Sequence, residues 1–350
     1  GRPVDLHNIE EGPRMVKIKA VGLLAAVVAV CPAFAVAQNA GEAEQAASRL
    51  READRLEQQG MAAVAAGNYA SAAIPLEAAL MIREKELGPD HADTVRVLNG
   101  LGTVSLALGR PEEAEALLRR ALTASEKALG PDHPDVADIL HNLANVYASS
   151  DDVRRVEQSL PLLERAATVR AKALWPDHPR VAEAINRMAA VDLFLAERAG
   201  AWQMPDLLAG VRRTPASLAR PKLSREEYLA HSERGFKQAL AIREKALGPD
   251  HPAVASALAS LAAVYTARTH YAQAEPLLKR ALAISEKTLG PNHPATANIL
   301  DDYADALSNA RKDSASLAEA KAMKIRARAI LDGQVRRASA DAPRDSSPVR

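Results

Sequence analysis

Apolar residues recur along this chain with the period of an α-helix, in two stripes that alternate. One copy of the first stripe consists of Leu140, Leu143, Ala144 and Tyr147, and positions 258, 261, 262 and 265 repeat its spacing. Residues spaced i, i+3, i+4 and i+7 lie on one face of a helix. A second stripe follows each first one, as at Ala114, Leu118 and Ala121. The pattern therefore predicts a series of helical hairpins, in which the small residues mark where two helices approach closely.

A pentapeptide close to Gly-Pro-Asp-His-Pro separates these hairpins. Its five histidines are His91, His133, His178, His251 and His293. Their separations of 42, 45, 73 and 42 residues indicate a repeat of about 42 residues, a period typical of a solenoid. Gly suits the left-handed position after a helix, and the next Pro cannot continue that helix. Asp or His then caps the following helix, so the motif predicts a structural corner between two hairpins.

Two short patterns in these units resemble the packing signature of tetratricopeptide repeats (TPRs). These are Leu-Ala/Gly-x-x-Tyr in the first helix and Ala-x-x-x-Leu-x-x-Ala in the second. The 42-residue length resembles the variant found in kinesin light chains, and the likeness covers about residues 43–331. It implies an all-α fold, a right-handed α-solenoid of about six TPR-like helical hairpins. We place the hairpins at 43–91, 92–133, 134–178, 179–251, 252–293 and 294–331.

The fourth hairpin departs from the pattern, because about residues 199–223 intrude between its helices with three prolines and Trp202. Ser224 and Glu227 have the spacing of a capping box that restarts the second helix. With this insertion, the solenoid is expected to span residues 38–331. Residues 332–350 are rich in Arg, Ser, Asp and Pro and are predicted to form a disordered tail.

The first 37 residues are expected to stand apart from the fold. Residues 15–37 have the layout of a signal peptide: a basic start, an apolar run from Ala20 to Val30, and small residues before a cleavage site. Cleavage after Ala37 fits best and cleavage after Ala35 is second. Residues 1–14 are interpreted as a non-native or mis-annotated leader. An uncleaved anchor is the minor alternative, since the run is shorter than the ~20 residues of a spanning helix.

A signal of this kind predicts a periplasmic or secreted protein with no stable membrane insertion after cleavage. Cys31 is the single cysteine, and the bulky Val30 before it argues against lipid anchoring there. Removing residues 1–37 takes away four of 45 basic and three of 44 acidic residues, leaving 41 of each. A neutral chain has no net positive field, so nucleic acid is not the expected partner. Aromatic residues are only 3% of the chain, which favours closely packed helices over a β-sandwich.

The sequence offers little catalytic apparatus, and we expect no enzyme activity, no cofactor and no metal. The five histidines belong to different hairpins, about a helix diameter (~10 Å) apart, so one ion cannot collect two of them. No Ser-His-Asp grouping or phosphate-binding glycine loop is present. Carboxylate pairs such as Glu112–Glu113 and Asp301–Asp302 are interpreted as solvated charges on helix turns.

Stacked hairpins leave a surface lined by the first helix of each unit, and this surface is the candidate binding site. The resemblance implies groove positions at fixed offsets from the Leu of the Leu-Ala pair. They are Arg96, Asn99, Thr103, Asp138, His141, Asn142, Asn145, Glu183, Asn186 and Arg187. The fifth unit offers Ser256, Ala259 and Ala263, and the sixth Asn298, Asp301, Asp302 and Asp305. Asn side chains both donate and accept, so the strip suits the backbone of an extended peptide. The same residues also fit a plain solvated helix face.

These features predict an exported scaffold or adaptor that binds a protein or peptide partner in a groove. The alternative is a regulatory or localising subunit of an envelope enzyme or assembly machine, without catalysis of its own.

Overall fold

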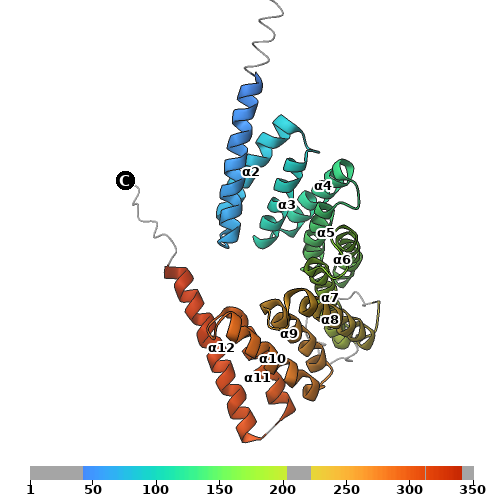
Figure 1. The fold of residues 1–350 in the computed structure, drawn as a ribbon, viewed down its shortest axis with the longest axis vertical. Coiled ribbons are helices and arrows are strands. Elements are labelled where there is room, and N and C mark those ends of the chain that lie inside the picture. The colour runs from blue at the N-terminus through green and yellow to red at the C-terminus, as the bar shows by residue number, and fades with distance from the viewer. Residues whose placement is uncertain (1–41, 203–221, 312, 341–350) are drawn as a thin grey trace, which may run out of the picture. The chain divides into compact units, whose positions relative to one another are not determined.

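The computed structural model describes residues 42–202, 222–311 and 313–340, and this part of the chain is helical with no strand (Figure 1). The chain divides into two compact units, one ending at Gly88 and the other beginning at Pro89. The predicted leader and signal peptide lie outside the described residues. Among the described helices, none is both long and apolar enough to cross a membrane.

The first unit is one hairpin, formed by a helix over residues 42–65 and α2 (Tyr69–Leu87). Leu76 is fully buried, and a Cβ on Gly60 would lie 2.6 Å from its Cγ, so only glycine allows this close approach. Arg83 is 2% exposed and forms ion pairs of 2.6 Å with Asp54 and 2.7 Å with Glu57. The two helices of this unit are thus joined by both apolar packing and buried charge pairing.

The second unit consists of five further hairpins. They are α3 (Ala92–Ala107) with α4 (Pro111–Leu129), α5 (Pro134–Ala148) with α6 (Val153–Ala173), α7 (Pro179–Trp202) with α8 (Arg225–Leu247), α9 (Pro252–Ala267) with α10 (Tyr271–Thr288), and α11 (Pro294–Ala310) with α12 (Ser314–Ala340). Each helix packs mainly against its neighbours in sequence, and first helices of successive hairpins also touch, as α3 does α5. Contacts limited to adjacent repeats define a solenoid. The α-solenoid of helical hairpins predicted from the sequence is confirmed.

Each corner histidine is the N-cap of the helix that follows it. The Nδ1 atom accepts a hydrogen bond from the backbone N–H two residues later, at 3.2 Å for His91 and His133, 3.0 Å for His178, and 3.1 Å for His251 and His293. Of the two caps that the sequence allowed, histidine is therefore the one used. Gly130 has the positive φ expected (88°), but its ψ of 159° lies in an extended region that only glycine enters readily.

The corner aspartates have a different role from the capping one considered above. Each pairs with a lysine on the second helix of the next hairpin, in the pairs Asp90–Lys127, Asp132–Lys172, Asp177–Lys245 and Asp250–Lys287. The fifth corner carries Asn292 in place of aspartate. These side chains are well exposed, so each pair adds only ~0–1 kcal/mol, but the series repeats along the stack and favours one register between hairpins.

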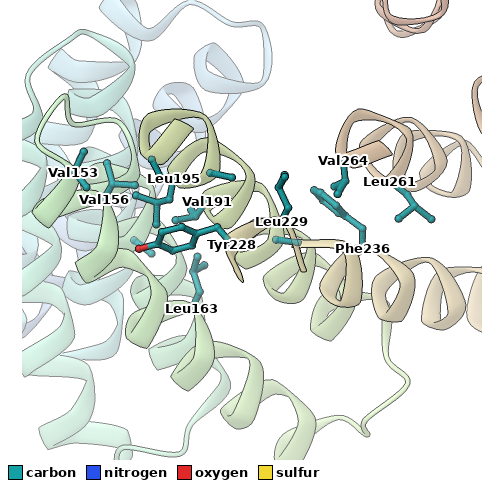
Figure 2. Close-up of a cluster of buried hydrophobic side chains, with 14 residues drawn as sticks. Val153, Val156, Leu163, Val191, Leu195, Tyr228, Leu229, Phe236, Leu261 and Val264 are labelled. Atoms are coloured by element: carbon teal, nitrogen blue, oxygen red, sulfur yellow. The ribbon is translucent and has the colours of Figure 1, made fainter. Parts of the chain in front are cut away.

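A large apolar cluster of the described residues joins the third, fourth and fifth hairpins (Figure 2). Its labelled members are Val153, Val156 and Leu163 of α6, Val191 and Leu195 of α7, Tyr228, Leu229 and Phe236 of α8, and Leu261 and Val264 of α9. Tyr228 also donates its hydroxyl to Oε1 of the buried Glu157 at 2.7 Å, and the backbone N–H of Lys222 donates to the same oxygen at 2.7 Å. These two hydrogen bonds connect α6 to the start of α8 and to the short segment just before it.

Two predicted boundaries differ from the observed helices. The α7 helix runs to Trp202, past the expected insertion start at 199, and residues 203–221 lie outside the described part. The capping box of Ser224 and Glu227 at the start of α8 is confirmed. At the other end, α12 continues to Ala340 through residues assigned to the tail, because Ala, Arg and Gln there favour helix.

Candidate functional site

The first helices α3, α5 and α7 line two hollows, to which eight of the ten predicted groove residues contribute. The larger one, about 500 Å³, is named the Arg187 hollow. It is lined by Leu106, His141, Asn145, Ser149, Glu183, Asn186, Arg187, Ala190 and Arg243. The smaller one, about 250 Å³, is named the Arg96 hollow. It is lined by Ala92, Val95, Arg96, Asn99, Leu129, Asp135, Asp138 and Ile139.

The other two predicted residues, Thr103 and Asn142, line neither hollow and instead contact Asn99. The Asn142 Nδ2 atom donates to Asn99 Oδ1 at 2.9 Å, which links α3 to α5. Thr103 Oγ1 donates to the backbone oxygen of Asn99 at 3.2 Å. Each amide group has a second polar atom that this Asn–Asn bond does not use, so the pair can still bind a peptide backbone.

Arg170, from α6, lies behind the strip with its side chain 5% exposed. It pairs with Asp138 at 2.8 Å and with Glu183 at 3.6 Å, and it donates to the backbone oxygen of Arg180 at 3.1 Å. Its charge is thus shared between acidic groups of two successive first helices. Arg170 therefore holds α5 and α7 in register from beneath and neutralises the acidic groups at this point of the strip.

His141 contributes an uncharged ring to the Arg187 hollow. Burial is the main cause that lowers the pKa of His141, with Arg170 and Arg187 also lowering it and Glu183 raising it. Within the described part of the chain, its Nδ1 atom is buried and has no hydrogen-bond partner. The ring is therefore neutral at neutral pH, and its Nδ1 is an unused polar atom within the lining of the hollow.

Two arginines supply the positive charge of the Arg187 hollow. Burial lowers the pKa of both Arg187 and Arg243 from their usual value, although a guanidinium keeps its proton at any physiological pH. Arg243 donates to Asn186 Oδ1 at 3.4 Å and to the backbone oxygen of Ala253 at 3.2 Å. Neither contact is to a carboxylate, although the charge of Glu183 acts on Arg243 and partly opposes the lowering of its pKa.

Sequence reasoning missed four residues of this hollow: Leu106, Ser149, Ala190 and Arg243. Arg243 belongs to a second helix, whereas the groove positions were taken from first helices alone. A signal was nevertheless present, because the position eight residues before each corner histidine holds either a long cation or a small residue. It is occupied by Arg83, Ser125, Arg170, Arg243 and Ser285 in the five copies.

The sixth hairpin places three aspartates on the same face of its first helix, α11. Burial, together with the charges of Asp301 and Asp305, raises the pKa of Asp302 to about 6, although the residue keeps part of its surface in solvent. Lys324 of α12 pairs with Asp305 at 2.5 Å. The fifth hairpin carries Ser256, Ala259 and Ala263 at the equivalent positions, so charge is concentrated on either side of it.

The histidines considered as metal ligands and the carboxylate pair Glu112–Glu113 lie apart from one another. The five histidines stand at five separate helix starts, and Glu112 and Glu113 occupy the exposed first turn of α4. Across the described ranges, no group of three His, Cys, Asp or Glu side chains is arranged to hold a metal ion.

The sequence matches a family model described as tetratricopeptide repeat at residues 55–127, 101–155, 229–287 and 261–328. A second model with the same description matches residues 136–180. Together the matches include more than half of the chain. The chain belongs to the tetratricopeptide repeat family. Such repeats are generally non-catalytic scaffolds for protein interactions, and TPR domains bind protein or peptide partners.

Solved structures similar to this chain include proteins described as kinesin light chain or its bacterial counterpart. The crystal structure of BtubC (BKLC) from P. vanneervenii is 19% identical, with a TM-score of 0.52, over 88% of this chain and 94% of that one. A Podosopora anserina kinesin light chain, whose TPR-like repeats are nearly identical to one another, is 22% identical to this chain. The match covers 70% of this chain and 96% of that one, with a TM-score of 0.48. No curated protein matches the TPR chain significantly.

Proposed function

We propose that this TPR protein is a non-catalytic scaffold that binds an extended segment of a protein partner along α3, α5 and α7. The observation that carries the proposal is the convergence of predicted groove residues on two adjoining hollows, each formed by side chains of at least two hairpins. Binding across hairpins suits a solenoid, because successive first helices present side chains at regular intervals to a chain laid across them.

The amide groups of the strip are suited to the main chain of such a segment. Asn99, Asn145 and Asn186 lie at the hollows, and each carries a donor and an acceptor. Asn99 and Asn142 are already held together by their own hydrogen bond, so little side-chain freedom remains to be lost when a ligand binds. The strip therefore favours contacts with the peptide backbone over reading of every side chain.

The test compares the wild type with the triple variant Asn99→Ala/Asn142→Ala/Asn186→Ala in an affinity pull-down. The matched control is Gln158→Ala/Gln238→Ala/Gln273→Ala, which removes three exposed amides from the second helices α6, α8 and α10. We expect the wild type and the control to recover the same proteins, and the asparagine variant to lose them by at least tenfold, with an unchanged helical circular dichroism spectrum. Equal recovery by all three proteins would place binding elsewhere.

A further inference from the structure

Arg187 of α7 is half-buried and has no acidic partner. Among the residues that the structure describes, no carboxylate lies within ion-pair distance of its guanidinium, and its buried Nε has no hydrogen-bond partner. Arg170 provides the comparison one hairpin earlier: it is more deeply buried and its Nε likewise has no hydrogen-bond partner, but Asp138 and Glu183 compensate its charge. A half-buried cation without an anion is costly, and an anion from outside would relieve that cost.

The register of the repeat explains why a second cation of the hollow, Arg243, has fewer acidic neighbours than Arg170. Arg170 contacts the acidic residue five positions after the corner histidine in two successive hairpins, Asp138 and Glu183. Arg243 occupies the same place one hairpin later, but α9 carries Ser256 where the next acidic residue would be. Serine in place of an acidic residue removes one negative charge. Arg243 instead donates hydrogen bonds to Asn186 and to the Ala253 carbonyl.

The charges that line the Arg187 hollow do not balance. Arg187 and Arg243 bring two positive charges, and Glu183 is the only acidic lining residue. Glu183 is already 3.6 Å from Arg170 and is shared with it. His141 and the amides of Asn145 and Asn186 add polar atoms without charge. A hollow of about 500 Å³ with this excess of positive charge has room for an acidic side chain and the potential to attract it.

We propose that the Arg187 hollow binds the carboxylate of an aspartate or glutamate side chain carried by the extended partner segment. This inference rests on the proposed function and specifies one side chain of the partner. A guanidinium binds a carboxylate through two parallel hydrogen bonds, and such charge-assisted bonds are about twice as strong as neutral ones. The hollow is lined by two guanidinium groups and one carboxylate, so one further negative charge balances its excess, whereas a phosphate dianion would exceed it.

The test uses an array of acetylated, amidated nine-residue peptides with random flanks and a fixed central residue. Three versions carry Glu, Gln or phosphoserine at the centre, and amidation removes any C-terminal carboxylate. We expect the wild type to bind the Glu peptides about tenfold more tightly than the Gln peptides, and more tightly than the phosphoserine peptides. Arg187→Gln should abolish that preference, and Arg243→Gln should reduce it.

The matched control is Arg180→Gln, which removes the same charge from the same helix at an exposed position outside the hollow, and which should keep the preference. A Glu preference that survives Arg187→Gln, or a stronger preference for phosphoserine, would overturn the inference. If peptides bind without any Glu preference but lose affinity in the triple asparagine variant, only this inference fails. If no peptide in the array binds the wild type, the inference fails and the proposed function fails with it for extended segments.

Discussion

Replacing Phe236 by alanine is expected to lower the free energy of unfolding by roughly 3–5 kcal/mol, the usual cost of removing a buried phenyl ring. Phe236 is 1% exposed on α8, and Figure 2 shows its ring next to Val264 of α9, which belongs to the same cluster. In a solenoid each hairpin is held mainly by its neighbours. The loss should therefore weaken the junction between the fourth and fifth hairpins more than either hairpin itself.

Urea unfolding followed by circular dichroism measures this effect. We expect a lower midpoint for Phe236→Ala and a broader or two-step transition, because the two sides of the junction no longer unfold together. Phe194→Ala is the matched control, since Phe194 on α7 is only partly buried against the same cluster and should cost less. Indistinguishable curves for the wild type and Phe236→Ala would show that this cluster does not couple the hairpins.

Replacing Asp192 by asparagine is expected to stabilise the protein at pH 8 by roughly 2–4 kcal/mol. The upper value is the difference between the folded and unfolded pKa of Asp192, converted at about 1.36 kcal/mol per pKa unit. Asp192 is 7% exposed on α7. Burial raises the pKa of Asp192 to about 7, and the charge of Arg234 only partly opposes that shift. At pH 8 the folded protein thus holds a buried negative charge that asparagine would not carry.

The pH dependence gives the sign of this effect. Between about pH 4 and pH 7 the folded state binds a proton at Asp192 that the unfolded chain does not, so lowering the pH stabilises the wild type through this residue. The asparagine variant lacks that contribution, and the difference between the two proteins should disappear near pH 4. Urea midpoints at pH 8, 6 and 4, with Asp151→Asn as an exposed control, measure it. A variant no more stable than the wild type at pH 8 would contradict the burial argument.

Helix positions could be predicted well from the sequence, because both apolar stripes and the corners repeat locally. The roles of the aspartate and the histidine in each corner could not be predicted in this way. Aspartate is ordinarily the better N-cap, but here its side chain pairs with a lysine on the next hairpin, far away in sequence, and the histidine caps instead. A contact between neighbouring repeats leaves no mark in the local pattern. It appears only when equivalent positions of successive copies are compared.

The candidate site, too, could be predicted from the sequence only in part. First-helix residues such as His141 and Asn186 follow from the repeat register, and the structure places them at one hollow. Arg243 comes from a second helix and reaches the hollow because its side chain is long, which the register does not reveal. Asp192 occupies the position held by Tyr147 and Tyr265 in other repeats, so the sequence shows the substitution, but only the packing shows that the carboxylate is buried.

Hydrogen exchange with and without the protein partner recovered in the pull-down tests the central claim most directly, because it locates the bound segment on the helices. The account predicts that binding slows exchange of backbone amides in α3, α5 and α7, the first helices that line the two hollows, and leaves α10 and α12, which line neither, unchanged. Protection confined to the second helices, with α5 and α7 exchanging as in the free protein, would contradict it.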